Sequence, residues 1–165
     1  MATDNFKHLV LTHYGSMYRV AYSILRDSDD AQDAVQDAVA SMWARRSLLG
    51  DVGNYESFCV KAVKNRCIDM LRARASRAEP VDSFPDEAYG SASPDTEVEA
   101  RDTLSLVKSL VEQLPPLQQE VLRLRSEADC DLQEIAAITG VTHENARTLL
   151  SRARRRLKDL YNNIK

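Results

Sequence analysis

Hydrophobic residues recur every three or four positions over long stretches of the chain, as they do along one face of a helix. In the first half, residues 6–24, 31–43 and 55–71 each carry such a stripe. Each stripe is long enough for a helix of several turns with one buried face. No stretch of useful length alternates between polar and apolar residues, so strands are not expected. The pattern therefore predicts an all-α protein.

Two polar segments separate these three helices. Residues 26–30 form a polar turn, in which Ser28 or Asp29 can cap the second helix. Residues 48–54 contain two glycines and lack a helical period. Glycine without periodicity is typical of irregular backbone, so this second segment is predicted to be a loop.

The third helix has two different faces. Its inner face is predicted to hold Tyr55, Phe58, Cys59, Ala62, Val63, Cys67, Met70 and Leu71. Its outer face is predicted to hold Lys61, Lys64, Asn65, Arg72 and Arg74. Basic groups with aromatic rings beside a loop suit single-stranded nucleic acid, because the charges bind the backbone and the rings stack on unpaired bases. The alternative is that Tyr55 and Phe58 are ordinary core residues.

The second half of the chain begins with two further helices. Residues 104–114 carry an apolar stripe, and Pro115 and Pro116 follow it directly. Proline cannot continue a helix but is well suited to its first turn. The prolines are therefore expected to end one helix and to open another through residues 117–124.

A short helix, a tight turn and a longer helix come next. Asp131, with Glu134 three positions later, forms a capping box that opens the short helix. Gly140 suits a left-handed helix end, and Thr142 can cap the second helix. This spacing is typical of a helix-turn-helix, whose second helix enters the major groove of DNA.

The last helix also has two faces. Its inner face is small and aliphatic, with Ala146, Leu149, Leu150, Ala153 and Leu157. Its outer face is polar and basic, with His143, Glu144, Arg147, Thr148, Ser151 and Arg155. From residue 140 onward, seven basic residues stand against two acidic ones, an excess that suits phosphates. The alternative is an amphipathic helix with an ordinary solvated basic face.

Charge is distributed in blocks along the 165 residues, although the formal net charge is only -3. Residues 27–37 hold five acidic residues and no basic one, whereas residues 61–77 hold six basic residues and one acidic one. Residues 79–99 hold seven acidic residues and no basic one. The small net charge argues against a protein that coats nucleic acid uniformly. With 44% hydrophobic residues, the chain can build one core or two small ones.

Residues 78–100 differ from the rest in composition, because proline, serine, glycine and acidic residues dominate them. Such a composition predicts a flexible acidic linker between two domains. Fully extended it spans about 65 Å, whereas a flexible coil of this length averages about 25 Å. The tether lets a partner set the spacing of the domains. The alternative is an acidic mimic of nucleic acid inside a basic channel.

The chain shows no pattern of residues that indicates catalysis. Cys59, Cys67 and Cys130 are an odd number without paired metal spacing, and no signal peptide or membrane-length apolar run is present. We expect a reduced, cytoplasmic protein without membrane insertion, with Cys59 and Cys67 in the core; a redox sensor is the alternative. Phosphate loops and catalytic triads are absent, so no enzyme activity, catalytic residue, metal, cofactor or small-molecule substrate is expected.

Two parts of the chain resemble one family, the extracytoplasmic-function (ECF) type of bacterial RNA polymerase sigma factor. The first part comprises DAQDAVQDAVASMW at residues 30–43, YESF at 55–58 and KNRCIDMLR at 64–72. The second comprises LPPLQQEVLRLR at 114–125, EIA at 134–136 and LSRARRRL at 150–157. Both occur in the family's order, on either side of the acidic linker, and together they cover most of the chain.

The resemblance implies roles for residues in the first part. The residues that match the helix docking on a coiled coil of the polymerase's largest subunit are Asp33, Gln36, Asp37 and Trp43. Residues 48–54 and Asn65 match the elements that capture a flipped base of the minus-ten promoter element. The basic residues expected near the separating strands are Lys61, Lys64, Arg66 and Arg72.

The resemblance also assigns the second part to the minus-thirty-five promoter element. The residues that match its readers are Arg147, Thr148, Ser151 and Arg152, and Arg125 matches a phosphate contact. His143, Arg154 and Arg155 are expected beside them, the two arginines adding salt-sensitive affinity. Leu149 departs from the family pattern, because many relatives carry a basic residue there.

The family pattern divides the chain into residues 1–77 as a domain-two-like unit, residues 78–100 as the linker and residues 101–165 as a domain-four-like unit. It implies a factor that binds core RNA polymerase, directs initiation at promoter DNA, helps to melt it and is held by an anti-sigma factor. Two alternatives remain open. One is a helix-turn-helix regulator that works without polymerase, and the other is a decoy that binds core polymerase without supporting transcription.

Overall fold

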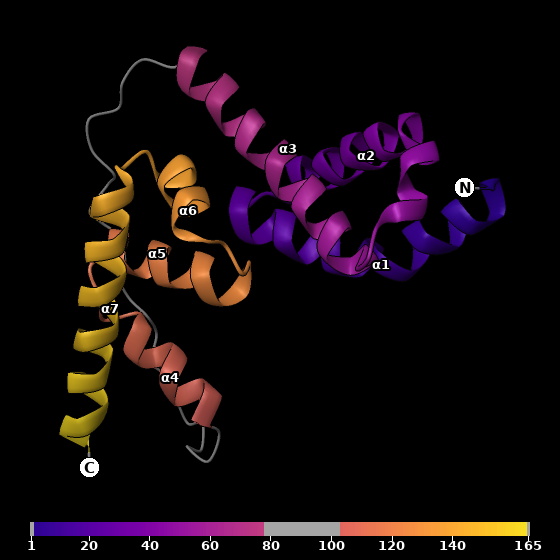
Figure 1. Ribbon diagram of the computed structural model, residues 1–165. Coiled ribbons are helices and arrows are strands. Elements are labelled where there is room, and N and C mark those ends of the chain that lie inside the picture. Colours follow the sequence, from indigo (N-terminus) through magenta and orange to yellow (C-terminus); the bar gives the residue numbers. More distant parts are fainter. Residues whose placement is uncertain (1, 78–102, 165) are drawn as a thin grey trace. The chain divides into compact units, whose positions relative to one another are not determined.

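The computed structural model describes residues 2–77 and 103–164. Both ranges are helical and neither contains a strand, so the prediction of an all-α protein is confirmed. The helices form two compact units, which are called unit 1 (residues 2–77) and unit 2 (residues 103–164) below (Figure 1). The predicted acidic linker, residues 78–100, lies outside the described residues.

Unit 1 is a bundle of three helices, α1 (Thr3–Leu25), α2 (Ser28–Ala44) and α3 (Tyr55–Arg77). Each helix packs against the other two. Between α2 and α3, a 3-10 helix, η1, spans Arg46–Asp51. The largest fully buried side chains of this unit are Met17, Val35, Met42, Leu49, Cys59, Val63 and Cys67. The three predicted stripes therefore meet in one core.

Two details of unit 1 differ from the sequence prediction. Asp27, and neither Ser28 nor Asp29, caps α2, because its extended backbone lets its Oδ1 accept a hydrogen bond from the Asp30 amide at 2.9 Å. The predicted loop is partly ordered as η1, because Leu49 is buried in the core and its carbonyl accepts a hydrogen bond from the Tyr55 hydroxyl at 3.1 Å. Both contacts depend on backbone geometry that periodicity does not report.

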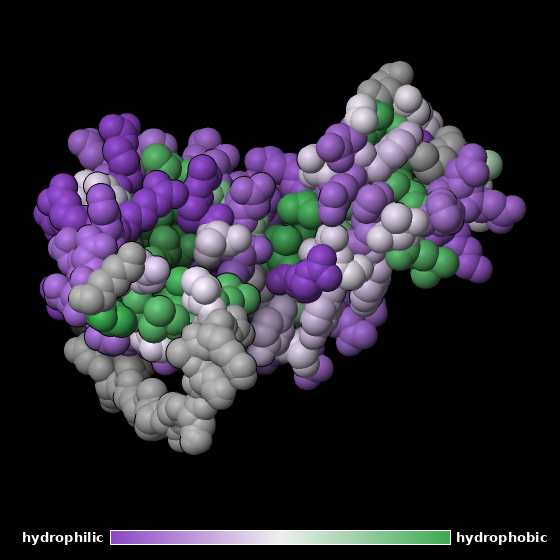
Figure 2. Space-filling view, turned by 90° about the horizontal axis from the view of Figure 1, so that it is seen from below, coloured by the Kyte–Doolittle hydropathy of each residue, from purple (hydrophilic) through white to green (hydrophobic). Residues whose placement is uncertain are grey.

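Unit 2 contains α4 (Thr103–Val111), α5 (Pro116–Glu127), α6 (Leu132–Thr139) and α7 (His143–Ile164). The long helix α7 packs against each of the other three. Its fully buried positions are small or aliphatic, as the inner stripe predicted. Figure 2 shows the outer surface, where hydrophilic side chains cover much of the visible face and hydrophobic residues lie in patches between them.

The prolines open α5 but do not end α4. Pro116 stands in the first turn of α5, as predicted, whereas α4 already ends at Val111. The last carbonyls of α4 accept hydrogen bonds from the amides that follow the helix, as Lys108 does from Glu112 at 3.2 Å and Val111 does from Leu114 at 3.0 Å. Beyond the helix, the Gln119 side-chain amide donates hydrogen bonds to the carbonyls of Glu112 at 3.2 Å and Leu114 at 2.8 Å, which satisfies backbone groups of the connection to α5.

The turn between α6 and α7 has the predicted chemistry. Asp131 Oδ1 accepts a hydrogen bond from the Glu134 amide at 2.8 Å, and Glu134 Oε1 accepts one from the Asp131 amide at 2.9 Å. Gly140 ends α6 with φ 81°, a left-handed conformation that favours glycine. Thr142 Oγ1 accepts a hydrogen bond from the Asn145 amide at 3.1 Å, which caps α7.

Loss of the capping box should weaken unit 2. Asp131→Ala leaves amide groups of the first turn of α6 without their side-chain partner, so we expect the free energy of unfolding to fall by about 1 kcal/mol. Hydrogen exchange of the α6 amides in the full chain measures this change. Glu127→Ala is the matched control, since it removes an exposed carboxylate from the end of α5 and should change stability by less than about 0.5 kcal/mol. Equal effects of both variants would contradict the capping role.

All three cysteines are buried thiols outside any disulfide bond, and Cys59 and Cys67 lie in the core as predicted. Burial raises the pKa of the Cys59 thiol to about 11, and the nearby Glu56 carboxylate adds to this rise. A thiol is reactive only as the thiolate, so Cys59 is protonated and inert at neutral pH. These observations support a packing role for Cys59 and argue against an activated thiol at this position.

The raised pKa of Cys59 predicts a loss of stability in alkali. In the unfolded chain this thiol titrates near its ordinary pKa of about 8.5, whereas in the folded protein it stays protonated to a higher pH. Its contribution is therefore present below about pH 8.5 and lost as the pH rises through about 11. Urea denaturation between pH 8 and pH 11 should show a steeper fall for the natural chain than for Cys59→Ala. Identical slopes would refute the assignment.

Candidate nucleic-acid interface

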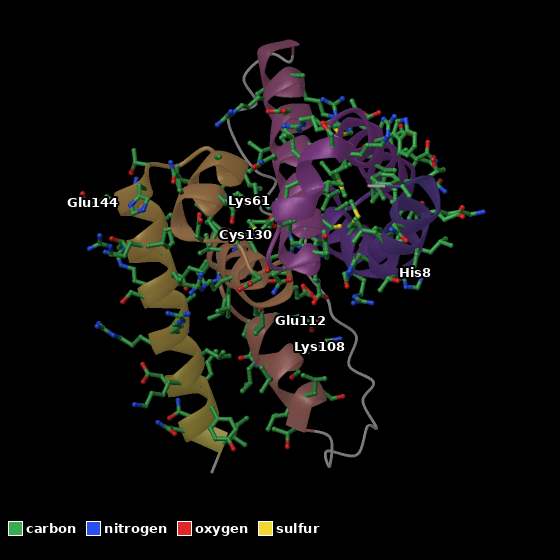
Figure 3. All side chains as sticks on the ribbon, turned by 45° about the vertical axis from the view of Figure 1, so that its right-hand side comes forward. His8, Lys61, Lys108, Glu112, Cys130 and Glu144 are labelled. Carbon is green, nitrogen blue, oxygen red and sulfur yellow. The ribbon has the colours of Figure 1, made fainter. Side chains whose placement is uncertain are left out.

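The first turns of α7 present a polar face to solvent. His143, Arg147 and Ser151 are exposed, whereas Ala146 and Leu150 on the opposite side are buried. This division follows from the period of the helix, because residues four apart lie on the same face. Figure 3 shows Glu144 projecting from the first turn of α7, away from α6. The outer face predicted from the sequence is thus largely accessible to a partner, with Thr148 half-buried.

An open groove of about 650 Å³ runs beside this face. It is lined by Arg125, Asp131, Leu132, Gln133, His143, Arg147, Leu150, Ser151 and Arg154. The end of α5, the start of α6 and one side of α7 thus meet at one surface. Among the predicted minus-thirty-five residues, the groove brings together Arg125, His143, Arg147, Ser151 and Arg154. Thr148, Arg152 and Arg155 do not line it, although Arg152 and Arg155 are exposed elsewhere on α7.

Arg125 is held in place by the turn between α5 and α6. Its Nη1 donates a hydrogen bond to the Cys130 carbonyl at 3.0 Å, and the Cys130 amide donates to the Leu124 carbonyl at 3.1 Å. A guanidinium carries several N–H donors, so this bond leaves others for an anion at the groove. Arg125 therefore has a fixed position next to Arg147 and Arg154 on the groove wall.

The sequence patterns did not single out Gln133 as a groove residue. It stands in the first turn of α6 and is exposed. Its side-chain amide can both donate and accept hydrogen bonds, which suits phosphate oxygens and base edges. Its position just after the cap residue Asp131 was the available signal, because the first turn of the first helix borders the second helix in a helix-turn-helix.

On α3, most of the predicted nucleic-acid residues are accessible, with one correction. Lys61, Asn65 and Arg72 are exposed and Arg66 is half-buried, whereas Lys64 is only 7% exposed. The prediction that Lys64 lies on the outer face is therefore wrong. The reason is that α3 packs against both α1 and α2, which widens its buried face beyond a single stripe.

The acidic edge of α2 is also accessible. Asp33, Gln36 and Asp37 are exposed, whereas Trp43 is half-buried. The Trp43 ring meets the edge of Phe6 with ring centroids 5.1 Å apart, and the guanidinium of Arg46 lies 3.9 Å from the Trp43 centroid. Trp43 thus joins the start of α1 to the start of η1, so it has a packing role within unit 1 whatever else it contacts.

Ion pairs connect the acidic edge of α2 with the basic residues of α3. Arg66 Nε donates a hydrogen bond to Asp37 Oδ2 at 3.0 Å, and Arg74 Nη2 pairs with Asp30 Oδ2. The structure therefore brings together Asp37, a predicted polymerase contact, and Arg66, a predicted DNA contact. Sequence periodicity did not reveal this pairing, because the two residues belong to different helices.

The described residues hold neither a metal-ligand cluster nor a helix suited to a membrane. Within residues 2–77 and 103–164, no group of three His, Cys, Asp or Glu side chains is arranged to hold a metal ion. In the same ranges, no helix combines the length and apolar character needed to span a membrane.

Comparison with known proteins places both units in one family. The family model described as Sigma-70 region 2 matches residues 9–77, and the model described as Sigma-70, region 4 matches residues 104–157. The RNA polymerase sigma factor SigV of Bacillus subtilis is 30% identical over 149 residues, which cover 90% of this chain and 84% of SigV. The ECF RNA polymerase sigma factor SigM of Mycobacterium tuberculosis is 28% identical over 156 residues, covering 94% of this chain and 76% of SigM.

One solved structure has a similar fold. It contains the sigma factor RpoE of Bartonella quintana in complex with the anti-sigma factor NepR, and it aligns with 97% of this chain and 98% of its own. The TM-score is 0.53 and the sequence identity 23%, so this likeness supports the fold alone. The two matched regions and the similarity to SigV and SigM lead to one conclusion: the chain belongs to the sigma-70 family of RNA polymerase sigma factors, in its extracytoplasmic-function group.

Proposed function

We propose a division of roles between the two units of this sigma factor. As a member of its family, the chain binds core RNA polymerase and directs initiation at specific promoters. In the proposal, residues 1–77 act as domain two, which docks on the polymerase and engages the minus-ten element. Residues 101–165 act as domain four, which reads the minus-thirty-five element, and residues 78–100 tether the two.

The observation that carries the proposal is the groove of unit 2. Arg125, Arg147 and Arg154 line it, and the one carboxylate among its lining residues, Asp131, already accepts the Glu134 amide. Three guanidinium groups next to an exposed helix face suit a DNA major groove between two phosphate strands. In this arrangement Arg147 pairs with a guanine edge, which is worth about 1–3 kcal/mol of discrimination against other bases.

The other predicted contacts of unit 2 fit the same orientation. Arg125 and Gln133 bind phosphate oxygens from the groove wall, and His143 and Ser151 lie beside Arg147. Thr148, Arg152 and Arg155 extend the contact along the outer side of α7. Leu149 is half-buried, so it fills part of the inner packing and leaves little surface for a base contact.

Unit 1 supplies the second half of the proposal. Asp33, Gln36 and Asp37 form an exposed acidic edge, which fits a basic surface on the polymerase. Trp43 completes that edge with its exposed part. Lys61, Asn65, Arg66 and Arg72 then lie towards the separated strands, where residues 48–54 receive an unstacked base. Unstacking costs a few kcal/mol, which backbone charge and a fitted pocket offset once the polymerase holds the duplex.

Regulation by an anti-sigma factor completes the proposal. The Bartonella quintana sigma factor of similar fold was solved in complex with such a partner. A partner of this kind would hold the factor in the cytoplasm and cover its polymerase and DNA surfaces until a signal releases it. While the anti-sigma factor covers these surfaces, polymerase and promoter DNA cannot bind them, because one surface cannot contact two macromolecules at once.

Run-off transcription tests the proposed function directly. Purified core polymerase is supplied with a genomic fragment library, with and without the full chain. We expect new discrete start sites that appear only when the chain is added and share two upstream sequence elements. Core binding without new starts would favour a decoy, and DNA binding without core binding would favour a plain helix-turn-helix regulator.

The role of Arg147 can be tested on one of the promoters found in this way. Arg147→Ala in the holoenzyme should weaken binding about 5- to 150-fold when the minus-thirty-five element is intact and much less when it is scrambled. Arg156→Ala is the matched control, because it removes the same charge from an exposed position of α7 outside the groove. If both variants lose the same affinity on both fragments, Arg147 contributes charge and does not read bases.

A further inference from the structure

The ion pair between Arg66 and Asp37 joins two residues with different proposed partners. Asp37 belongs to the acidic edge that docks on polymerase, and Arg66 belongs to the basic set near the separated strands. In the free chain, Arg66 Nε donates to Asp37 Oδ2 at 3.0 Å. About half of each side chain remains exposed, 42% for Arg66 and 51% for Asp37. Each partner could therefore reach its group without any unfolding of the bundle.

We propose that this ion pair couples polymerase binding to promoter binding. In the free protein, Asp37 occupies Arg66 and lowers the affinity of unit 1 for single-stranded DNA. When a basic surface of the polymerase binds Asp37, Arg66 loses its partner and turns to the phosphate backbone. This inference rests on the proposed function, since it requires Asp37 to contact polymerase and Arg66 to contact DNA.

The strength of the pair suits such a switch. An ion pair between exposed side chains contributes little because water and salt screen it. A competing basic partner can therefore displace Arg66 at small cost, whereas a deeply buried pair would resist exchange. Because the ion pair is weak, its release can change DNA affinity only modestly. We expect a change of about two- to fivefold at low salt.

A second ion pair on the same two helices provides an internal control. Arg74 Nη2 pairs with Asp30 Oδ2, also between α3 and α2. Asp30 belongs to neither assigned set, and Arg74 lies on the basic outer face of α3 but outside the residues assigned to the separated strands. Asp30→Asn therefore removes the same charge as Asp37→Asn and also breaks one α2–α3 ion pair. The two variants differ in which arginine they release.

The test is a double-mutant cycle on the full chain. Its variants are Asp37→Asn, Arg66→Gln, Asp30→Asn, and the two double variants that combine each aspartate change with Arg66→Gln. The probe is a fluorescent single-stranded oligonucleotide that carries the non-template minus-ten sequence of a start site mapped by run-off transcription. We expect Asp37→Asn to tighten binding by the free chain about two- to fivefold and to make it more salt-dependent. In the Arg66→Gln background this gain should fall to the net-charge effect, which is the gain that Asp30→Asn gives with or without Arg66.

Two outcomes would overturn the coupling while leaving the proposed function intact. If Asp37→Asn lowers the melting temperature but does not tighten oligonucleotide binding, the Arg66–Asp37 ion pair only stabilises the packing of α3 against α2. If Asp30→Asn and Asp37→Asn give equal gains, and both persist without Arg66, the effect is one of net charge. Either result refutes a specific release of Arg66.

Failure of the proposed roles themselves has separate signatures. Asp37→Asn with unchanged affinity for core polymerase would remove Asp37 from the docking edge. Arg66→Gln with unchanged oligonucleotide binding by the holoenzyme would remove Arg66 from the DNA surface. Each of these results also overturns the coupling. Both are measured with polymerase present, which distinguishes them from the two outcomes above, measured on the free chain.

Discussion

The orientation of α7 about its own axis decides which of its residues form the proposed DNA face of unit 2. This helix packs against α4, α5 and α6, and Ala146 and Ala153 are fully buried in that contact. Alanine at such positions lets neighbouring helices approach closely, so larger side chains would push α7 outward. With the inner stripe fixed, Arg147 and Ser151 have to face solvent beside α6. The packing of small side chains thereby sets the direction of the charged ones.

The parts of this fold that sequence reasoning predicted correctly are those set within a few residues. The capping box of Asp131 and Glu134, the left-handed Gly140 and the cap at Thr142 all act inside one turn of the backbone. Helical periodicity is equally local, which is why the two faces of α7 were predictable. Most of the groove residues, including Arg125 and Arg147, followed from the helix-turn-helix spacing and the family resemblance.

The features that sequence reasoning missed depend on contacts between helices. Burial of Lys64 requires α3 to be enclosed by two neighbours, and the connection from α4 to α5 depends on the Gln119 side chain, which donates to the carbonyls of Glu112 and Leu114. The pairing of Arg66 with Asp37 requires α2 and α3 to lie side by side in one register. A single stripe of hydrophobic residues contains no information on how many neighbours a helix has, so none of these contacts could be read from periodicity.

The burial of the three cysteines has a consequence for how signals reach this sigma factor. They are all the cysteines of the chain, and each side chain is closed to solvent. Small oxidants act on exposed thiolates, so they do not reach these three thiols in the folded protein. An oxidant would reach them only after the helices that cover them open, and such opening also exposes the core of the unit. Any response of these cysteines to oxidation is therefore tied to a loss of folded structure.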